Sequence, residues 1–174
     1  MAGIPFSMLT RQLLALGAAG FSSRYPHAWL VWEPGERVAP MPKPGIPVTT
    51  VVPVSSPSRA PTVEDPLCFP LVVPVSGLAM RVGRAPESDL VVDDLTVSRE
   101  HFALGLESAD WVITVPAASN ATTMVRNMSL QPGEKMRLLD GCTIVAGGVQ
   151  FTYLKSTRLL ARLVARVEQL KNGG

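Results

Sequence analysis

Prolines are concentrated in one stretch of this sequence, where 11 of the 16 prolines lie between Pro34 and Pro74. Proline fixes φ and removes the backbone donor that helices and central strands need. The stretch therefore cannot be a continuous folded core, and residues 34–66 are predicted to form a linker of extended, polyproline-like character. Because 174 residues are also short for two full domains, the chain is expected to hold one cored domain with appendages.

After the linker, the sequence becomes a series of short apolar runs separated by Gly, Asp and Pro. Examples are LAMRVG, HFALGL, WVITVP and VQFTYL. Regularly spaced short strands of this kind are typical of an all-β sandwich or barrel. Residues 67–154 are therefore predicted to form the main domain, and the fold class is predicted to be mainly β.

Both ends of the chain carry helical patterns. Residues 6–16 have apolar side chains at helical spacing that stops at Gly17 and Gly20, and HAWLVW after them predicts a short strand. Residues 1–33 are thus predicted to form a helix and strand extension, which packs on the main domain or on a partner because neither element can bury itself alone. Residues 155–174 predict an amphipathic helix capped by Ser156 or Thr157. Its apolar stripe comprises Leu159, Leu160, Leu163, Val164, Val167 and Leu170, and a face predicted to be solvated carries Arg158, Arg162 and Arg166.

Composition argues against several classes of function. The 16 Lys and Arg residues nearly balance 14 Asp and Glu residues, and a net charge of +2 offers no broad field for nucleic acid or acidic membranes. His27 and His101 have no metal-binding motif around them, so neither a metal site nor another cofactor is predicted. Cys68 and Cys142 lie far apart in the sequence and are predicted to be buried thiols. No apolar run approaches the roughly 20 residues of a membrane-spanning helix.

One segment gathers residue types that bind phosphate groups. Residues 83–101, GRAPESDLVVDDLTVSREH, place Arg84 just after one predicted strand and Ser98, Arg99 and His101 just before the next. In a sandwich, such loops cluster at one end. A phosphorylated threonine brings about −1.5 to −2 charges and three strong acceptor oxygens, so its receptor needs convergent donors, preferably arginine. The segment predicts a phosphate site that requires no catalysis.

The order GR, SD and SRxH in this segment resembles the forkhead-associated (FHA) domain family. Residues 118–122, ASNAT, resemble the next loop of that family, and LQPG at 130–133 and LDGCTIVAG at 139–147 resemble its following turns. The resemblance covers about half of the chain. It implies an FHA-type two-sheet antiparallel β-sandwich that binds a phosphothreonine peptide.

The resemblance also implies a role for each matching residue. Arg84 and Ser98 would hold the phosphate, and Arg99 would flank it. Ser119 would add a contact from the adjoining loop, and Asn120 would bind the peptide backbone.

Three further residues would support the site: Gly83 in the GR pair, His101 beneath Ser98, and Asp89, which would tie down the turn after Arg84. Ala121 departs from the family, which prefers glycine there. An extra residue before Leu130 leaves Arg126 and Asn127 near the place where the family has an asparagine. The part of the site that would contact the peptide therefore departs further from the family than the part that would bind phosphate.

Two alternatives from other classes of function compete with phosphopeptide recognition. Ser98 and His101 could be a nucleophile and a base with Asp89, Asp93 or Asp94, but the sequence has neither a nucleophile elbow nor an oxyanion turn, so no catalytic residue is predicted. The stronger rival is a degenerate FHA scaffold that acts as a structural or oligomerisation module through its terminal amphipathic segments. Loss of partner binding in Leu163→Asp, with Arg84→Ala unaffected, would favour this scaffold.

The expected partner is a protein or peptide phosphorylated on threonine, and the expected role is an adaptor in Ser/Thr kinase signalling. The linker itself contains Thr49, Thr50 and Thr62, so its own phosphorylated form is a second candidate ligand. The chain is expected to be cytoplasmic. Residues 1–22 leave a secretory signal as the alternative, because an apolar stretch follows Arg11. The oligomeric state stays open.

Overall fold

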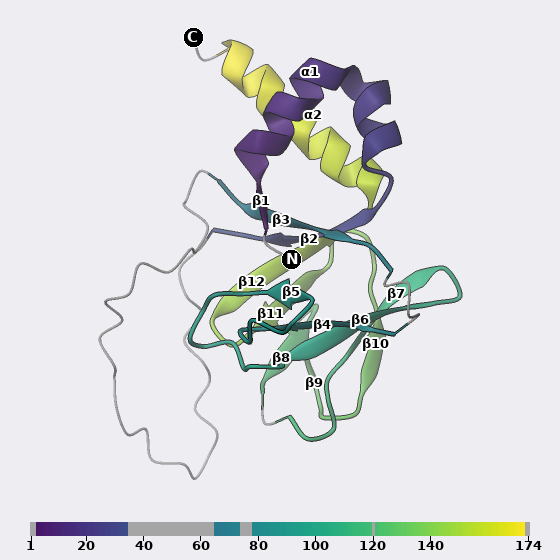
Figure 1. The fold of residues 1–174 in the computed structure, drawn as a ribbon, viewed down its shortest axis with the longest axis vertical. Coiled ribbons are helices and arrows are strands. Elements are labelled where there is room, and N and C mark those ends of the chain that lie inside the picture. Colours follow the sequence, from purple (N-terminus) through teal and green to yellow (C-terminus); the bar gives the residue numbers. More distant parts are fainter. Residues whose placement is uncertain (1–2, 35–64, 74–77, 120, 173–174) are drawn as a thin grey trace.

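The computed structural model of the chain describes residues 3–34, 65–73, 78–119 and 121–172. The predicted linker threonines Thr49, Thr50 and Thr62, and the predicted peptide-binding Asn120, lie outside the described residues. Within them, the strands form two sheets that face each other. This arrangement confirms the predicted mainly β sandwich (Figure 1).

The larger sheet contains seven described strands, in the order β1 (Ile4–Pro5), β3 (Leu67–Leu71), β2 (Ala28–Trp32), β12 (Val149–Leu154), β11 (Thr143–Ala146), β8 (Thr123–Val125) and β9 (Met128–Leu130). The smaller sheet contains five, in the order β10 (Lys135–Arg137), β7 (Asp110–Thr114), β6 (Phe102–Glu107), β4 (Met80–Gly83) and β5 (Leu90–Val91). Their pairings are antiparallel except for β4 with β5, which are parallel. The second sheet is thus mixed, where the sequence predicted antiparallel strands alone.

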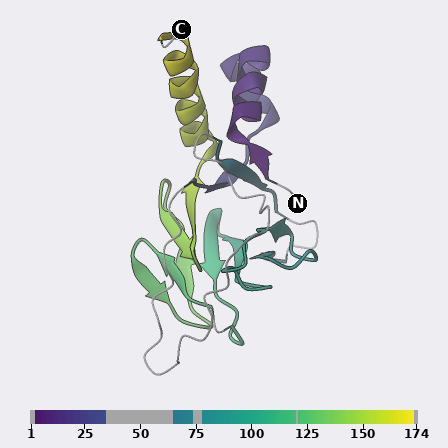
Figure 2. The ribbon, with the colours of Figure 1, turned by 90° about the vertical axis from the view of Figure 1, so that its left-hand side faces the viewer.

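Two helices add a third layer to the sandwich. Helices α1 (Phe6–Arg24) and α2 (Ser156–Asn172) pack together on the outer face of the larger sheet. Figure 2 shows them side by side above the strands. The layer buries one apolar cluster of its own, while the two sheets enclose the main core between them.

Strand β2 contributes to both of these cores. Leu30 and Trp32 point into the sandwich, whereas Trp29 and Val31 lie under the helices, and all four are buried. A strand covered on both faces reads as a continuous apolar run rather than an alternating one, which explains the sequence AWLVW. The expectation that residues 1–33 pack on the main domain is therefore confirmed.

The position of β2 bears on the predicted domain boundaries, because this strand comes from residues 1–33 and not from the predicted main domain. β2 pairs with β12 on one side and with β3 on the other, so it is an inner strand of the larger sheet. The division into residues 1–33, 34–66, 67–154 and 155–174 stays a prediction. A test by truncation is described in the Discussion.

Helix α1 extends beyond its predicted end. Gly17 has φ of 67°, which kinks the helix, but the helical path resumes and reaches Arg24. The second part places Phe21, which is 1% exposed, in the cluster under the helices. An apolar residue at one isolated helical position was too weak a signal to extend the prediction past Gly17.

The start of α1 is held by Asp65 and Pro66, the last two residues of the predicted linker. The backbone N–H of Ser7 donates to Asp65 Oδ1 at 2.7 Å, and the Ser7 hydroxyl donates to Asp65 Oδ2 at 2.8 Å. The N–H of Phe6 donates to the carbonyl of Pro66 at 2.8 Å. These bonds satisfy donors that a helix start leaves unpaired, and the carboxylate also complements the helix dipole.

At the other end of the chain, α2 begins at Ser156, so the residue before it is Lys155. The predicted caps, Ser156 and Thr157, are therefore inside the first turn rather than before it. The N–H of Lys155 donates to Asp140 Oδ1 at 2.8 Å.

Cys68 and Cys142 are buried free thiols, as predicted, and burial raises the pKa of each. Among the described helices, none has the length and apolar character needed to cross a membrane.

Candidate functional site

Four connections meet at one end of the sandwich and carry the predicted site. They are residues 84–89 after β4, residues 92–101 before β6, residues 115–119 and 121–122 after β7, and the turn at Gly147 and Gly148. The N–H of Arg84 donates to the carbonyl of Ser98 at 2.9 Å, which joins the first two. The N–H of Gly148 donates to Thr96 Oγ1 at 2.8 Å, and His101 Nε2 lies 3.2 Å from the carbonyl oxygen of Thr122. The four connections thus form one hydrogen-bonded platform.

Gly83 allows the first two loops to approach this closely. A Cβ on Gly83 would lie 2.1 Å from the carbonyl oxygen of Arg99, which no real side chain can do. The same carbonyl accepts the N–H of Ala85 at 3.0 Å and the hydroxyl of Ser88 at 3.3 Å. The glycine of the GR pair is therefore required by the contact between backbones, which gives a physical reason for its predicted supporting role.

The residues predicted to bind phosphate lie at this junction. Arg84 is exposed, and its Nε donates to the carbonyl of Val97 at 3.1 Å, which orients the guanidinium. Ser98 is half-buried and Arg99 is exposed. Among the described residues, the Ser98 hydroxyl and the Arg99 guanidinium have no hydrogen-bond or ion-pair partner. The structure thus brings Arg84, Ser98 and Arg99 together with donors available for a ligand.

His101 braces the loop that carries Ser98, as the resemblance implies. It is 1% exposed, and its Nδ1 accepts the backbone N–H of Ser98 at 3.0 Å. Nδ1 must therefore be unprotonated, which leaves the proton on Nε2 to be donated to the carbonyl of Thr122. Burial lowers the pKa of His101 from its ordinary value of 6.5, which matches this neutral form.

A pH dependence follows from this arrangement. Because the folded pKa of His101 is lowered, its contribution to stability is fully present above pH 6.5 and is lost as the pH falls from 6.5 through the folded value. Urea unfolding at about pH 7.5 and at about pH 5 should show that the free energy of unfolding of the native chain falls at the lower pH. The fall should be smaller in His101→Asn. The control His27→Asn should keep the native loss, and equal losses in all three would contradict the role of His101.

A second set of bonds fixes the loop before Ser98, and it was not predicted. Asp94 is 4% exposed, and its Oδ1 accepts the N–H of Thr96 at 2.8 Å and the Thr96 hydroxyl at 2.6 Å. A Cβ on Gly147 would lie 2.1 Å from the carbonyl oxygen of Thr96. The spacing Asp-x-Thr is a known turn signal that could have identified Asp94. The contact with Gly147 spans about half the domain in sequence, so no local pattern could have predicted it.

Asp89 ties the first loop back to its own strand. Its Oδ2 accepts the backbone N–H of Arg81 at 2.8 Å and lies 3.7 Å from Arg81 Nε. Arg81 also donates from Nη2 to the carbonyl of Glu87 at 2.8 Å. Asp89 is therefore joined to β4 by these bonds.

The loop after β7 has its own turn. The Ser119 hydroxyl oxygen accepts the N–H of Ala121 at 3.0 Å, and the N–H of Ser119 donates to the carbonyl of Pro116 at 2.9 Å. Ser119 is thus engaged in shaping the loop, while its own hydroxyl proton remains available. This loop reaches the rest of the platform through the bond between His101 and Thr122.

Arg126 and Asn127, which fall near the asparagine of the family, form the two-residue turn between β8 and β9. Their φ values are 52° and 63°. A hairpin turn with two positive φ values favours asparagine at its centre. The sequence signal at Asn127 is therefore explained by turn geometry.

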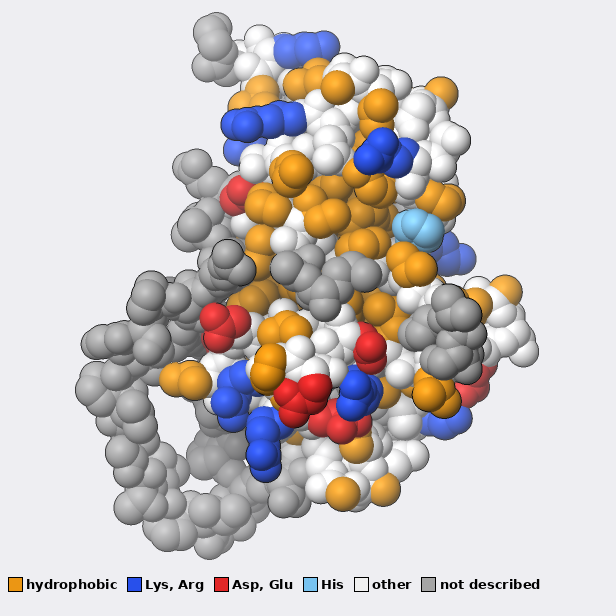
Figure 3. All heavy atoms as spheres, viewed as in Figure 1, with side chains coloured by type: hydrophobic (Ala, Val, Ile, Leu, Met, Phe, Trp, Pro, Cys, Tyr) orange, Lys and Arg blue, Asp and Glu red, His pale blue; other side chains and the backbone are white. Residues whose placement is uncertain are grey.

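Charges of both signs lie side by side on one face of the sandwich. On the face shown in Figure 3, Lys and Arg side chains lie intermixed with Asp and Glu side chains over the sandwich. This agrees with the small net charge of +2. In the described part of the chain, no group of three or more His, Cys, Asp or Glu residues could hold a metal ion.

Three solved structures illustrate what the chain is similar to. The FHA domain of the CT664 protein from Chlamydia trachomatis is 15% identical, with a TM-score of 0.48 over 74% of this chain and 97% of that one. The FHA domain of an Arabidopsis thaliana hypothetical protein is 21% identical, with a TM-score of 0.47 over 75% and 86%. EmbR of Mycobacterium tuberculosis, in complex with a low-affinity phosphopeptide, is 28% identical, with a TM-score of 0.43 over 51% and 22%.

No curated protein matches the chain. The family model described as FHA domain matches residues 80–147. This range includes Arg84, Ser98 and Arg99, and it runs from the start of β4 to the Gly147 turn. The chain therefore contains a forkhead-associated domain, matched over residues 80–147.

Proposed function

We propose that this chain is a phosphothreonine-peptide binding module in which Arg84 and Ser98 hold the phosphate and Arg99 flanks it. The observation that carries this proposal is the backbone hydrogen bond from the Arg84 N–H to the Ser98 carbonyl, 2.9 Å between N and O, which holds the two residues side by side. Ser119 would add a contact, and Asn120 would bind the peptide backbone. The FHA family match supports phosphothreonine as the residue that is read.

Charge and preorganisation both favour a phosphate ligand. A phosphothreonine at neutral pH carries about −1.5 to −2 charges, which two arginines can balance. Guanidinium donors bind phosphate oxygens in pairs, and such charge-assisted bonds are stronger than neutral ones. The loops are already held by His101, Asp94 and Gly83, so little ordering is needed when a peptide binds.

The orientation of His101 supports recognition rather than catalysis. A general base must lie within hydrogen-bond reach of the hydroxyl that it activates. Here Nδ1 accepts the backbone N–H of Ser98, and Nε2 faces the carbonyl of Thr122. Both ring nitrogens are therefore engaged elsewhere, and the Ser98 hydroxyl has no base among the described residues. A non-enzymatic adaptor in Ser/Thr kinase signalling is the role that fits best.

The rival scaffold reading loses support from the packing of the terminal helices. Leu159, Leu163 and Val167 of the α2 stripe are buried in the cluster under the helices, whereas Val164 and Leu170 are exposed. The buried part of the stripe is engaged within the chain and is not free to bind a partner. Leu163→Asp would place a charge in this core and would therefore disrupt folding. The variant cannot distinguish a phosphopeptide-binding module from a structural scaffold.

The proposal is tested by titrating an oriented phosphothreonine peptide library against the native chain and Arg84→Ala. Losing a charge-assisted hydrogen bond costs about 1.5–3 kcal/mol, so affinity should fall by about 10-fold to 100-fold. Arg137→Ala is a matched control, because it removes the same charge from a residue that is paired with Asp110 in the smaller sheet. The proposal would be refuted if Arg84→Ala bound the phosphorylated peptides as tightly as the native chain does, and if the native chain bound the dephosphorylated peptides equally well.

A further inference from the structure

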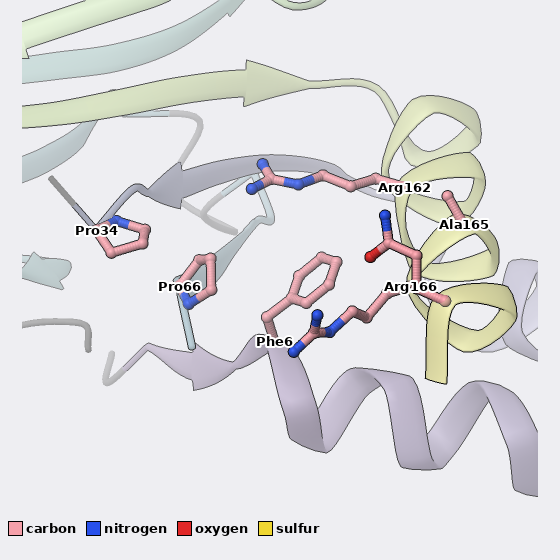
Figure 4. Close-up of a pocket in the computed structure, with 7 residues that line it drawn as sticks. Phe6, Pro34, Pro66, Arg162, Ala165 and Arg166 are labelled. Carbon is pink, nitrogen blue, oxygen red and sulfur yellow. The ribbon is translucent and has the colours of Figure 1, made fainter. Parts of the chain in front are cut away.

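A pocket in the helical layer shares no residue with the FHA site. Its volume is about 400 Å³, and it lies between the start of α1, the second half of α2 and the ends of β2 and β3. Figure 4 shows its lining residues: Phe6, Pro34, Pro66, Arg162, Ala165, Arg166 and Gln169. A cavity of roughly 300–1,000 Å³ is large enough for a small ligand or a side chain of a partner.

One of the two arginines in this pocket is already neutralised. Arg162, which the sequence predicted to be solvated, forms a two-pronged ion pair with Glu33: Nη1 to Oε1 at 2.5 Å and Nη2 to Oε2 at 2.8 Å. The Glu33 side chain is only 14% exposed. The Arg162 guanidinium also lies over the Phe6 ring, 5.2 Å from its centre. Arg162 therefore lines the pocket in a fixed position, and Glu33 neutralises its charge.

Arg166 differs from Arg162 in lacking any such partner. It is half-buried, and Figure 4 shows it reaching from α2 toward Phe6. Within the residues that the structure describes, its guanidinium makes no hydrogen bond or ion pair. A guanidinium carries five donors, and those of Arg166 are available to a ligand in the pocket. An anion at this position would satisfy those donors.

The remaining walls define the uncharged part of a ligand. Phe6, Pro34, Pro66 and Ala165 form an apolar surface beside Arg166, and Gln169 adds one amide. Rings and aliphatic groups can pack on such a surface. The pocket thus combines one cationic end with apolar sides.

Charges next to the pocket indicate a ligand with a single negative charge. Glu33 matches Arg162, and Asp65, next to Pro66, carries a second carboxylate at the start of α1. A phosphate group with nearly two charges would have only Arg166 to balance it, and the Asp65 carboxylate would repel it more strongly than a singly charged group. A carboxylate matches one guanidinium in both charge and shape.

We propose that this pocket binds a carboxylate attached to a small ring or apolar group, and that the Arg166 guanidinium donates hydrogen bonds to the carboxylate. Phe6, Pro34 and Pro66 contact the apolar part of the ligand. The proposal does not depend on phosphopeptide binding, because none of the residues of the FHA site takes part.

The test uses the full chain and 3-phenylpropionate, a ring linked to one carboxylate. Backbone amide NMR shifts of Ala165, Arg166 and Gln169 should saturate as it is added. The neutral 3-phenylpropionamide and the ringless acetate should each bind at least about 10-fold more weakly, which corresponds to about 1.4 kcal/mol. Inorganic phosphate should leave these signals unchanged.

Two variants make the result specific to the pocket. Arg166→Gln should weaken 3-phenylpropionate binding at least tenfold, and Ala165→Trp, which fills the pocket but keeps the arginine, should block it. Lys171→Gln removes one charge from an exposed position of the same helix and should bind as the native chain does. The proposal is overturned by unsaturated shifts in the native chain, by native-like binding in Arg166→Gln, or by phosphate binding more tightly than the carboxylate.

Discussion

Gly83→Ala is expected to lower the free energy of unfolding by about 2–4 kcal/mol and to abolish phosphopeptide binding. The new Cβ would lie 2.1 Å from the oxygen and 2.7 Å from the carbon of the Arg99 carbonyl. Both are backbone atoms, so they cannot move aside as a flexible side chain could. The loop would have to move away, which breaks the bonds from Arg84 to Ser98 and from Ala85 to Arg99.

A second glycine in the same sheet provides the matched control. A Cβ on Gly105 of β6 would meet only Ala79 Cβ, at an ordinary contact distance of 3.7 Å. Gly105→Ala should therefore change the free energy of unfolding by no more than about 0.5 kcal/mol. Urea unfolding and peptide titration of both variants check this. If Gly83→Ala is as stable and as active as Gly105→Ala, close contact between the loops is not what positions the site.

Deletion of residues 1–33 is expected to abolish cooperative folding. It removes β2 from between β12 and β3 and opens both cores at once. The side chains of Trp29, Leu30, Val31 and Trp32 are buried, and their burial alone contributes on the order of 6–12 kcal/mol. This is comparable with the whole stability of a typical domain, about 5–15 kcal/mol.

The same truncation tests the predicted domain boundaries. Thermal unfolding should show a sharp transition in the native chain and none in the truncated one. Deletion of residues 170–174 is the control, because Leu170 is 57% exposed and Lys171 and Asn172 are exposed. A truncated chain that unfolds cooperatively at the native temperature would show that residues 34–174 fold without the extension.

Local patterns in the sequence were sufficient for the class of fold and the order of the phosphate motif. Short apolar runs with turn residues between them predict strands because one or both faces of each strand must be buried. The same reasoning predicted helices near residues 6–16 and 155–174, and the structure has both. The spacing from Arg84 to Ser98 and His101 was also readable, since each residue lies beside a strand end.

The role of β2 could not be read in this way. AWLVW has no period of two, so the sequence does not say which faces are covered or which strands are neighbours. Pairing with β12 and β3 depends on segments that lie about 40 to 120 residues away. Likewise, the ion pair of Arg162 with Glu33 joins residues separated by 129 positions, so a helix face predicted to be solvated became part of a pocket.

The sequence by itself determined which residue types are available to bind a phosphate and in which order they occur, because the side chains of a loop depend only on the sequence of that loop. The tertiary structure decided how closely they approach: Gly83 against Arg99, Gly147 against Thr96 and His101 against Thr122 are all contacts between separate loops. It also decided that the extension at residues 1–33 supplies an inner strand. The physical reason is that close packing and strand pairing depend on distances between distant segments, which no local pattern specifies.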